Sequence, residues 1–183
     1  MITGDGEPVG AGIVRHPGVG MVSLTGDVGT GREVAKAAST TLKRVHLELG
    51  GKAPVVVFDE CDLESTVEGI KVGALFNSGQ DCTAATRVLV SERRYDDFLG
   101  ELVAAVEKLK VGDPRDPATE MGLVVSSEQL ERVGGFVERA VLAGGEVVTG
   151  GGALGQEGFW YMPTGSFPRA RPRRSSSGRS SAP

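Results

Sequence analysis

Residues 21–51, MVSLTGDVGTGREVAKAASTTLKRVHLELGG, decide the fold class of this chain. The short apolar run at residues 21–25 is typical of a strand, and residues 26–31 form a glycine-rich turn. Residues 32–42 place apolar side chains at helical spacing, and residues 45–49 alternate as a second strand. The order strand, turn, helix, strand predicts an α/β fold.

Strand and helix signals continue to alternate along the rest of the sequence. Residues 54–58 are a continuous β-branched run, which is typical of a strand buried on both faces. Asp62 is placed to cap a helix that carries apolar residues as far as residue 74. Further expected elements are one short helix within the glycine-rich residues 1–20, strands at residues 87–90 and 146–149, and helices at residues 95–109 and 127–143. The alternation predicts a sheet whose strands are mostly parallel.

Composition excludes several classes of protein. Of the 183 residues 39% are hydrophobic, and no run approaches the roughly 20 apolar residues of a membrane span, which argues against a membrane protein. The first residues lack the basic start and apolar segment of a secretory signal. Two cysteines, Cys61 and Cys82, are too few to hold a chain of this size by disulfides, so we expect a cytoplasmic protein with reduced thiols.

Charge is unevenly distributed along the sequence. The formal net charge is −4, although the last sixteen residues contain five arginines and no acidic residue. The body is therefore more acidic than the whole chain, which argues against nucleic-acid binding, because phosphate contacts need clustered Lys and Arg. We expect residues 165–183 to form a disordered Arg/Ser/Pro tail.

Two side chains and one turn are candidate functional groups. Cys82 lies in a polar, glycine-containing segment, where backbone N–H groups can stabilise a thiolate; a structural cysteine is an equal alternative on composition alone. Glu48 interrupts an apolar pattern, and facing inward it would suit a general base. Facing outward, which the alternation favours, it is the polar half of a strand. The turn at residues 26–31 could present backbone N–H groups to a phosphate.

Together, these segments resemble the NAD(P)-dependent aldehyde dehydrogenase superfamily. The matching motifs are VSLTGDVGTGREVAKAA at residues 22–38, LKRVHLELGGKAPVVVFDECDLESTVEG at 42–69, FNSGQDCTAATR at 76–87 and VGDPRDPATEMGLVVS at 111–126. The combination of LELGGK with GQDC, which carry Glu48 and Cys82, is the most specific of these signals. Within the superfamily, SGQDCTAATR and VSLTGDVGTG are most similar to γ-aminobutyraldehyde dehydrogenases.

The resemblance implies an α/β, aldehyde dehydrogenase-like architecture and an activity. Residues 1–47 would be the end of a Rossmann-type cofactor domain, and residues 48–164 the first part of the α/β catalytic domain. The implied reaction is oxidation of a small-molecule aldehyde, with aminoaldehydes as the narrower class, to the carboxylate with NAD or NADP. Intact relatives would be homo-oligomers, and no metal site, nucleic-acid partner or membrane contact is implied.

The resemblance also implies roles for individual residues. Cys82 matches the nucleophile that forms a thiohemiacetal and then a thioester, and its backbone N–H would donate to the oxyanion. Glu48 matches the general base that activates water to hydrolyse the thioester, and Leu49 matches the position beside the nicotinamide. The segment that faces the cofactor phosphates matches Gly26, Asp27, Val28, Gly29, Thr30 and Gly31. His16 and His46 match no catalytic position, and surface or strand packing explains both.

Departures from the family pattern lead to further expectations. Family members are far longer, so we expect a truncated fragment with an incomplete cofactor site; a non-enzymatic product is the alternative. The match stops at Thr164, and the Arg/Pro/Ser-rich sequence after it suggests a frameshift, with a genuine linker as the alternative. Asp27 stands where most relatives carry Ser, and its charge would repel a pyrophosphate. Asp81, beside Cys82, either pairs with a cationic substrate or points to solvent or caps the adjacent turn.

Overall fold

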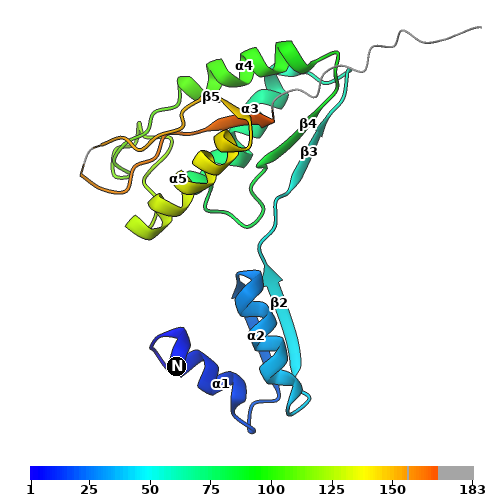
Figure 1. Ribbon diagram of the computed structural model, residues 1–183, viewed down its shortest axis with the longest axis vertical. Helices are drawn as coiled ribbons and strands as arrows, with labels where there is room; N and C mark the ends of the chain where they lie inside the picture. Colours follow the sequence, from blue (N-terminus) through cyan, green and yellow to red (C-terminus); the bar gives the residue numbers. More distant parts are fainter. Residues whose placement is uncertain (156, 169–183) are drawn as a thin grey trace, which may run out of the picture. The chain divides into compact units, whose positions relative to one another are not determined.

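The computed structural model describes residues 1–155 and 157–168, and Figure 1 shows its helices and strands. It divides into two compact units, Met1–Ala53 and the residues from Pro54 onward. The boundary expected between cofactor and catalytic parts, after residue 47, falls inside strand β2 (Arg44–Leu49) of the first unit. The functional assignment of the two parts stays a prediction.

The first unit is built on two parallel strands joined by a helix. Its elements, in order, are the π-helical turn η1 (Gly6–Gly10), α1 (Ala11–Arg15), β1 (Met21–Gly26), α2 (Val28–Ser39) and β2. The register of β1 and β2 runs from Met21 opposite Arg44 to Gly26 opposite Leu49. Both predicted strands and the short helix within residues 1–20 are confirmed.

Alternation along β1 and β2 separates an apolar face from a polar face. The apolar face carries Val22, Leu24, Leu47 and Leu49, and the opposite face carries Ser23, Thr25, His46 and Glu48. Helix α2 packs on the apolar face so closely that a Cβ on Gly31 would lie 2.7 Å from Cδ2 of Leu49. A larger residue at this position of the helix would therefore force the Leu49 side chain to move.

Helix α2 begins at Val28 and not at Arg32, so most of the predicted glycine-rich turn is the first helical turn. Asp27 is the reason, because its Oδ1 accepts hydrogen bonds from the backbone N–H groups of Gly29 (2.7 Å) and Thr30 (3.1 Å). This N-cap outweighs the low helix propensity of the glycines.

Helix α2 ends earlier than predicted, and the loop after it is tightly bound. The helix stops at Ser39 and not at residue 42, and Leu42 adopts a left-handed conformation with φ of 52°. Lys43 follows and is buried; its Nζ donates to the backbone oxygens of His16 and Val19, at 2.7 Å each. These bonds fix the segment before β1 to the loop before β2.

The second unit repeats the parallel arrangement. Its elements, in order, are β3 (Pro54–Val57), α3 (Leu63–Leu75), the 3-10 turn η2 (Phe76–Gly79), β4 (Arg87–Val90), α4 (Tyr95–Glu107), α5 (Ser127–Leu142), β5 (Gly145–Thr149) and β6 (Gly165–Pro168). β3 and β4 run parallel, and α3 connects them. The predicted cap of α3 is confirmed: the Asp62 carboxylate accepts from the N–H of Ser65 at 2.8 Å.

The core of this unit lies between α3, α4 and one face of the β3–β4 pair. Val57 of β3, Val67 and Ile70 of α3, and Phe98 of α4 form a buried cluster. The expected burial of β3 on both faces is wrong: Val57 is 3% exposed, whereas Val56 is 54% exposed. The described helices α3 and α4 pack on the Val57 side of the strands, so alternate residues stay in solvent.

Strands β5 and β6 form an antiparallel pair, with Gly145 opposite Pro168. The expectation of disorder from residue 165 is therefore wrong for Gly165–Pro168; residues 169–183 lie outside the described residues. Main-chain pairing with β5 orders this segment. The Phe167 ring adds an edge-to-face contact with Tyr95 of α4, at 5.9 Å between centroids and 83° between planes.

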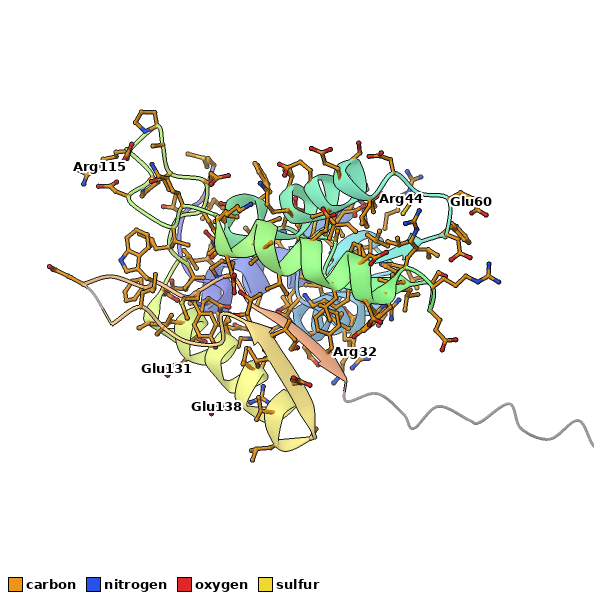
Figure 2. All side chains as sticks on the ribbon, turned by 90° about the horizontal axis from the view of Figure 1, so that it is seen from above. Arg32, Arg44, Glu60, Arg115, Glu131 and Glu138 are labelled. Carbon is orange, nitrogen blue, oxygen red and sulfur yellow. The ribbon has the colours of Figure 1, made fainter. Side chains whose placement is uncertain are left out.

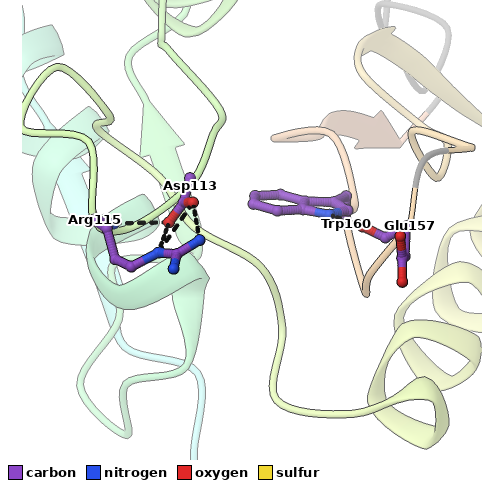
Figure 3. A network of polar contacts seen from close by, with 4 residues as sticks. All are labelled: Asp113, Arg115, Glu157 and Trp160. Carbon is purple, nitrogen blue, oxygen red and sulfur yellow. Dashed lines mark hydrogen bonds and ion pairs between the residues drawn. The ribbon is translucent and has the colours of Figure 1, made fainter.

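Polar contacts within two loops are drawn in Figure 3. The Arg115 guanidinium binds both carboxylate oxygens of Asp113, with Nε at 3.0 and 3.1 Å and Nη2 at 2.6 Å. These bonds lower the pKa of Asp113 to about 2. The buried Trp160 donates its indole N–H to the backbone oxygen of Glu157 at 2.8 Å, which ties the loop before β6.

Helix α5 is amphipathic and lies at the surface of its unit. Glu131 and Glu138 project outward from it (Figure 2), while Leu130 and Val133 are half-buried. Within residues 1–155 and 157–168, no helix combines the length and the apolar character that a bilayer span requires.

The core of the second unit makes a quantitative prediction. Phe98 is fully buried, so Phe98→Ala should lower the free energy of unfolding by about 3–5 kcal/mol, because it removes apolar contacts and leaves a cavity. Urea denaturation of the full chain measures this. Phe136→Ala, at an exposed ring on α5, is the control and should change stability by less than about 1 kcal/mol. Equal effects of the two variants would contradict the assigned core.

Candidate active site

Cys82 lies in a turn on the connection between α3 and β4, and its side chain is exposed. The preceding turn η2 has an unusual backbone, because Asn77, Ser78 and Gly79 are all left-handed, with φ of 50°, 58° and 72°. A left-handed non-glycine residue costs about 1–2 kcal/mol, so neighbouring bonds must hold this turn. Cys61, in contrast, is half-buried against the α3–α4 core. Exposure of Cys82 favours the chemical over the packing interpretation.

Side-chain hydrogen bonds tie the cysteine loop to the segment before α5. Ser78 donates its hydroxyl to the backbone oxygen of Gly122 at 2.9 Å. The backbone N–H of Val125 donates to Oε1 of Gln80 at 3.0 Å, and Nε2 of Gln80 donates to the backbone oxygen of Asn77 at 3.1 Å. These bonds hold the strained turn in place, and the position of Cys82 depends on that turn.

Asp81 caps the turn that contains Cys82. Its Oδ1 accepts from the backbone N–H of Thr83 at 2.8 Å and from the Thr83 hydroxyl at 2.9 Å. These two bonds lower the pKa of Asp81, and the Cys82 thiol adds a smaller effect in the same direction. Of the sequence alternatives, the structure shows the turn cap, and it leaves a fixed negative charge beside Cys82.

Glu48 faces outward from β2, as the alternation favoured. Its Oε1 lies 3.1 Å from Nε2 of His46, on the same strand and the same face. The sequence assigned no role to His46, although the alternation of the predicted strand at residues 45–49 already places it on the same face as Glu48. Leu49, on the opposite face, packs against Gly31 of α2. Glu48 and Leu49 belong to the first unit and Cys82 to the second.

The carboxylate of Asp27 occupies the N–H groups that a phosphate would use at the start of α2. Besides the two backbone donors, it accepts the Thr30 hydroxyl at 2.7 Å. The bond from the Thr30 hydroxyl lowers the pKa of Asp27 most, and the backbone bonds from Thr30 and Gly29 lower it further. The Asp27 carboxylate is therefore ionised at neutral pH. A second anion here would meet occupied donors and a like charge. In this conformation the segment from Gly26 to Gly31 does not fit a pyrophosphate.

The first unit also contains a cavity that the sequence did not reveal. It lies between α1, β1 and α2 and has a volume of about 1050 Å³. Its lining is largely apolar and includes Ala11, Val14 and Val34, with Thr30 at the first turn of α2. Gly6 and Gly10 also line it, and a Cβ at either would meet no atom within 4 Å. The glycine-rich start of the chain was the available signal in the sequence.

Comparison with known proteins identifies the family. Residues 1–165 match the aldehyde dehydrogenase family. The chain belongs to this NAD(P)-dependent enzyme family. A betaine aldehyde dehydrogenase of Sinorhizobium fredii is 44% identical over 167 residues, which cover 90% of this chain and 34% of that protein.

Solved aldehyde dehydrogenases share the fold. Lactaldehyde dehydrogenase from Escherichia coli is 40% identical, with a TM-score of 0.87 over 89% of this chain and 34% of the other. A betaine aldehyde dehydrogenase from Staphylococcus aureus, solved with NAD+, is 34% identical, with a TM-score of 0.88 over 90% and 34% of the two chains. The chain therefore spans about a third of the length of the curated relatives it matches. These relatives are named for betaine aldehyde and lactaldehyde, and not for γ-aminobutyraldehyde.

The Asp27 cap predicts a pH-dependent protection of two amides. A lowered pKa means that the cap is fully formed above the ordinary carboxyl value of 3.8 and is lost as pH falls through the lowered value. Hydrogen exchange at Gly29 and Thr30, relative to intrinsic rates, should stay slow from neutral pH to about pH 4. Asp27→Ala should accelerate exchange throughout this pH range, in which the cap is formed. Asp62→Ala, which removes the equivalent cap of α3, is the control and should leave both amides protected.

Proposed function

We propose that the chain carries the cysteine chemistry of an aldehyde dehydrogenase, with Cys82 as nucleophile and Glu48 as general base. The observation that carries the proposal is the exposed Cys82 in a turn held by side-chain ties, within a chain of this family. We also propose that the whole protein oxidises aldehydes, assembles as a homo-oligomer and is located in the cytoplasm.

The first step is addition of the Cys82 sulfur to an aldehyde carbon. The thiolate forms a carbon–sulfur bond, and the carbonyl oxygen becomes an oxyanion that the backbone N–H of Cys82 stabilises. Exposure lets the substrate reach the sulfur without movement of the loop. The ties from Ser78 and Gln80 keep the nucleophile in one orientation, which lowers the entropy lost on reaching the transition state.

After oxidation, Cys82 holds the acyl group as a thioester. Glu48 then takes a proton from water, and the resulting hydroxide attacks the thioester carbon. The carbon–sulfur bond breaks, the carboxylic acid leaves, and the proton held by Glu48 returns through solvent to the Cys82 thiolate, which regenerates the thiol and the carboxylate. A nicotinamide dinucleotide, when bound, would supply the hydride acceptor for the oxidation, and Asp27 would have to release the N–H groups at the start of α2 for its pyrophosphate to bind there.

The substrate class that we favour is an aldehyde with a cationic group. Asp81 places an ionised carboxylate next to Cys82, and such a charge attracts an ammonium group. The relatives named for betaine aldehyde support this class, because betaine aldehyde is a quaternary ammonium compound. An aminoaldehyde such as γ-aminobutyraldehyde belongs to the same class. Both uncharged and cationic aldehydes contain the carbonyl that Cys82 needs, so the charge decides specificity.

Acyl transfer without a dinucleotide is a second candidate activity. The observation that favours it is the self-capped start of α2, which does not fit a pyrophosphate. Ester hydrolysis at Cys82 needs only the nucleophile, the oxyanion donor and water.

Both candidates predict that Cys82 reacts with an activated ester. Mixing the full chain with p-nitrophenyl acetate should release a burst of p-nitrophenolate stoichiometric with Cys82, followed by slower turnover. Stopped-flow absorbance measures the burst. Cys82→Ala should abolish it, whereas Cys61→Ala should retain it, since Cys61 is half-buried. A burst that survives in Cys82→Ala would falsify the assignment.

The role of Asp81 predicts a change in substrate preference. We expect Asp81→Asn to lower the acylation rate with the p-nitrophenyl ester of betaine about tenfold, relative to the ester of 3,3-dimethylbutanoic acid, its uncharged isostere, because it removes the Coulomb attraction between the carboxylate and the trimethylammonium group. The ratio of the two rates is the measurement. Asp116→Asn is the control, because Asp116 also caps its own turn, through the N–H of Ala118 at 2.9 Å. An unchanged ratio would show that Asp81 only caps the turn.

A further inference from the structure

A row of three hydrogen-bonding side chains crosses the polar face of β1 and β2. Ser23 lies directly opposite His46 in the parallel register, and Glu48 follows His46 on the same face. The Ser23 hydroxyl is 3.3 Å from Nδ1 of His46, and Nε2 of His46 is 3.1 Å from Oε1 of Glu48. His46 therefore uses both ring nitrogens, one toward each neighbour.

The chemistry of the three groups fixes the direction of the hydrogen bonds. An ionised carboxylate only accepts, so Nε2 of His46 must carry the proton that it shares with Glu48. In the neutral imidazole Nδ1 is then an acceptor, and the Ser23 hydroxyl donates to it. When the ring is protonated, Nδ1 donates to Ser23 instead, and the contact with Glu48 becomes an ion pair. In both forms His46 remains bonded to Glu48.

We propose that His46 is a positioning residue for Glu48, and that Ser23 sets the orientation of its ring. The inference rests on the proposed function of Glu48 as general base. The side chains of His46 and Glu48 are 58% and 65% exposed, so packing does not hold either of them. The bond from His46 engages Oε1 of Glu48 and restricts the rotamers of the side chain. A base held in one rotamer loses less entropy when it takes a proton from water.

Other groups on this face do not replace His46. Arg44 lies two residues before His46, and Thr25 is opposite Glu48 in the register. Among the described residues, the ion pair of Glu48 is with His46, and no ion pair joins Arg44 to Glu48. The positioning of Glu48 therefore depends on one side chain, which makes it testable by substitution.

A spectroscopic experiment tests the row without any activity. Ring nitrogen shifts of His46, measured by NMR on the full chain at about pH 9, where free imidazole is neutral, should show a proton fixed on Nε2. Glu48→Ala and Ser23→Ala should each shift these signals toward the values of a free imidazole. His16, the other histidine, is the internal control and should not change in either variant. Unchanged His46 signals in both variants would overturn the proposal.

A kinetic experiment tests the consequence for Glu48. With p-nitrophenyl acetate, His46→Asn should slow hydrolysis of the acyl-Cys82 thioester about tenfold and leave the burst unchanged, because only the second step uses Glu48. His46→Gln should restore most of the rate, since the glutamine Nε2 can reach Glu48 as the imidazole Nε2 does. His16→Gln is the matched control.

The outcomes separate the inference from the proposed function. Equal thioester hydrolysis in His46→Asn and the wild-type chain, with a normal burst, would overturn the positioning role. Rescue by glutamine but not asparagine supports it, because a general loss of folding would affect both variants. Absence of a Cys82-dependent burst in the wild-type chain would refute the proposed function; the nitrogen shifts would then decide the Ser23–His46–Glu48 row alone.

Discussion

Parallel strand pairing is the constraint on which both candidate site segments depend. Two parallel strands cannot be joined by a tight turn; the chain must cross over and return to the same end, and here a helix makes each crossing. In the first unit α2 connects β1 to β2, and Asp27 lies where β1 passes into the helix. In the second unit α3 connects β3 to β4, and Cys82 lies where the crossing returns to the sheet. The glycine-rich turn and Cys82 therefore occupy crossover junctions, where backbone groups leave regular pairing, whereas Glu48 lies within β2.

The two junctions satisfy their free backbone groups in different ways. At the start of α2 a single side chain, Asp27, takes the exposed N–H groups. Before Cys82, two consecutive left-handed non-glycine residues are held by bonds that reach across to the segment before α5. The first solution is local, whereas the second couples residues distant in the sequence. Substitutions before α5 should therefore disturb Cys82, although they do not touch it.

The sequence predicted the order of strands and helices because periodicity and capping act over a few residues. The cap of α3 by Asp62 and the apolar seam of α4 are examples. It mispredicted features that depend on distant partners. Placing the start of α2 required knowing that the Asp27 cap outweighs two glycines in the first helical turn. The exposure of Val56 depends on the helices covering only one face of the strands, and strand β6 depends on its partner β5. Cys82 and Glu48 came from motifs, whereas the contact of Ser23 with His46 emerged only from the register of β1 and β2.

Aspartates at both junctions are already bound to their own backbone, and this limits what a ligand can do there. Asp27 and Asp81 each direct one carboxylate oxygen, Oδ1, to backbone N–H groups of the following residues. The pKa of each is lowered, for Asp27 above all by the Thr30 hydroxyl and then by the backbone bonds, and for Asp81 above all by the backbone N–H of Thr83. An anionic ligand at α2 must displace the Asp27 carboxylate from its donors, and charge repulsion opposes this. A cationic ligand near Cys82 need not displace Asp81, because a carboxylate accepts several hydrogen bonds at once. The same side-chain chemistry thus disfavours phosphate at one junction and favours an ammonium group at the other.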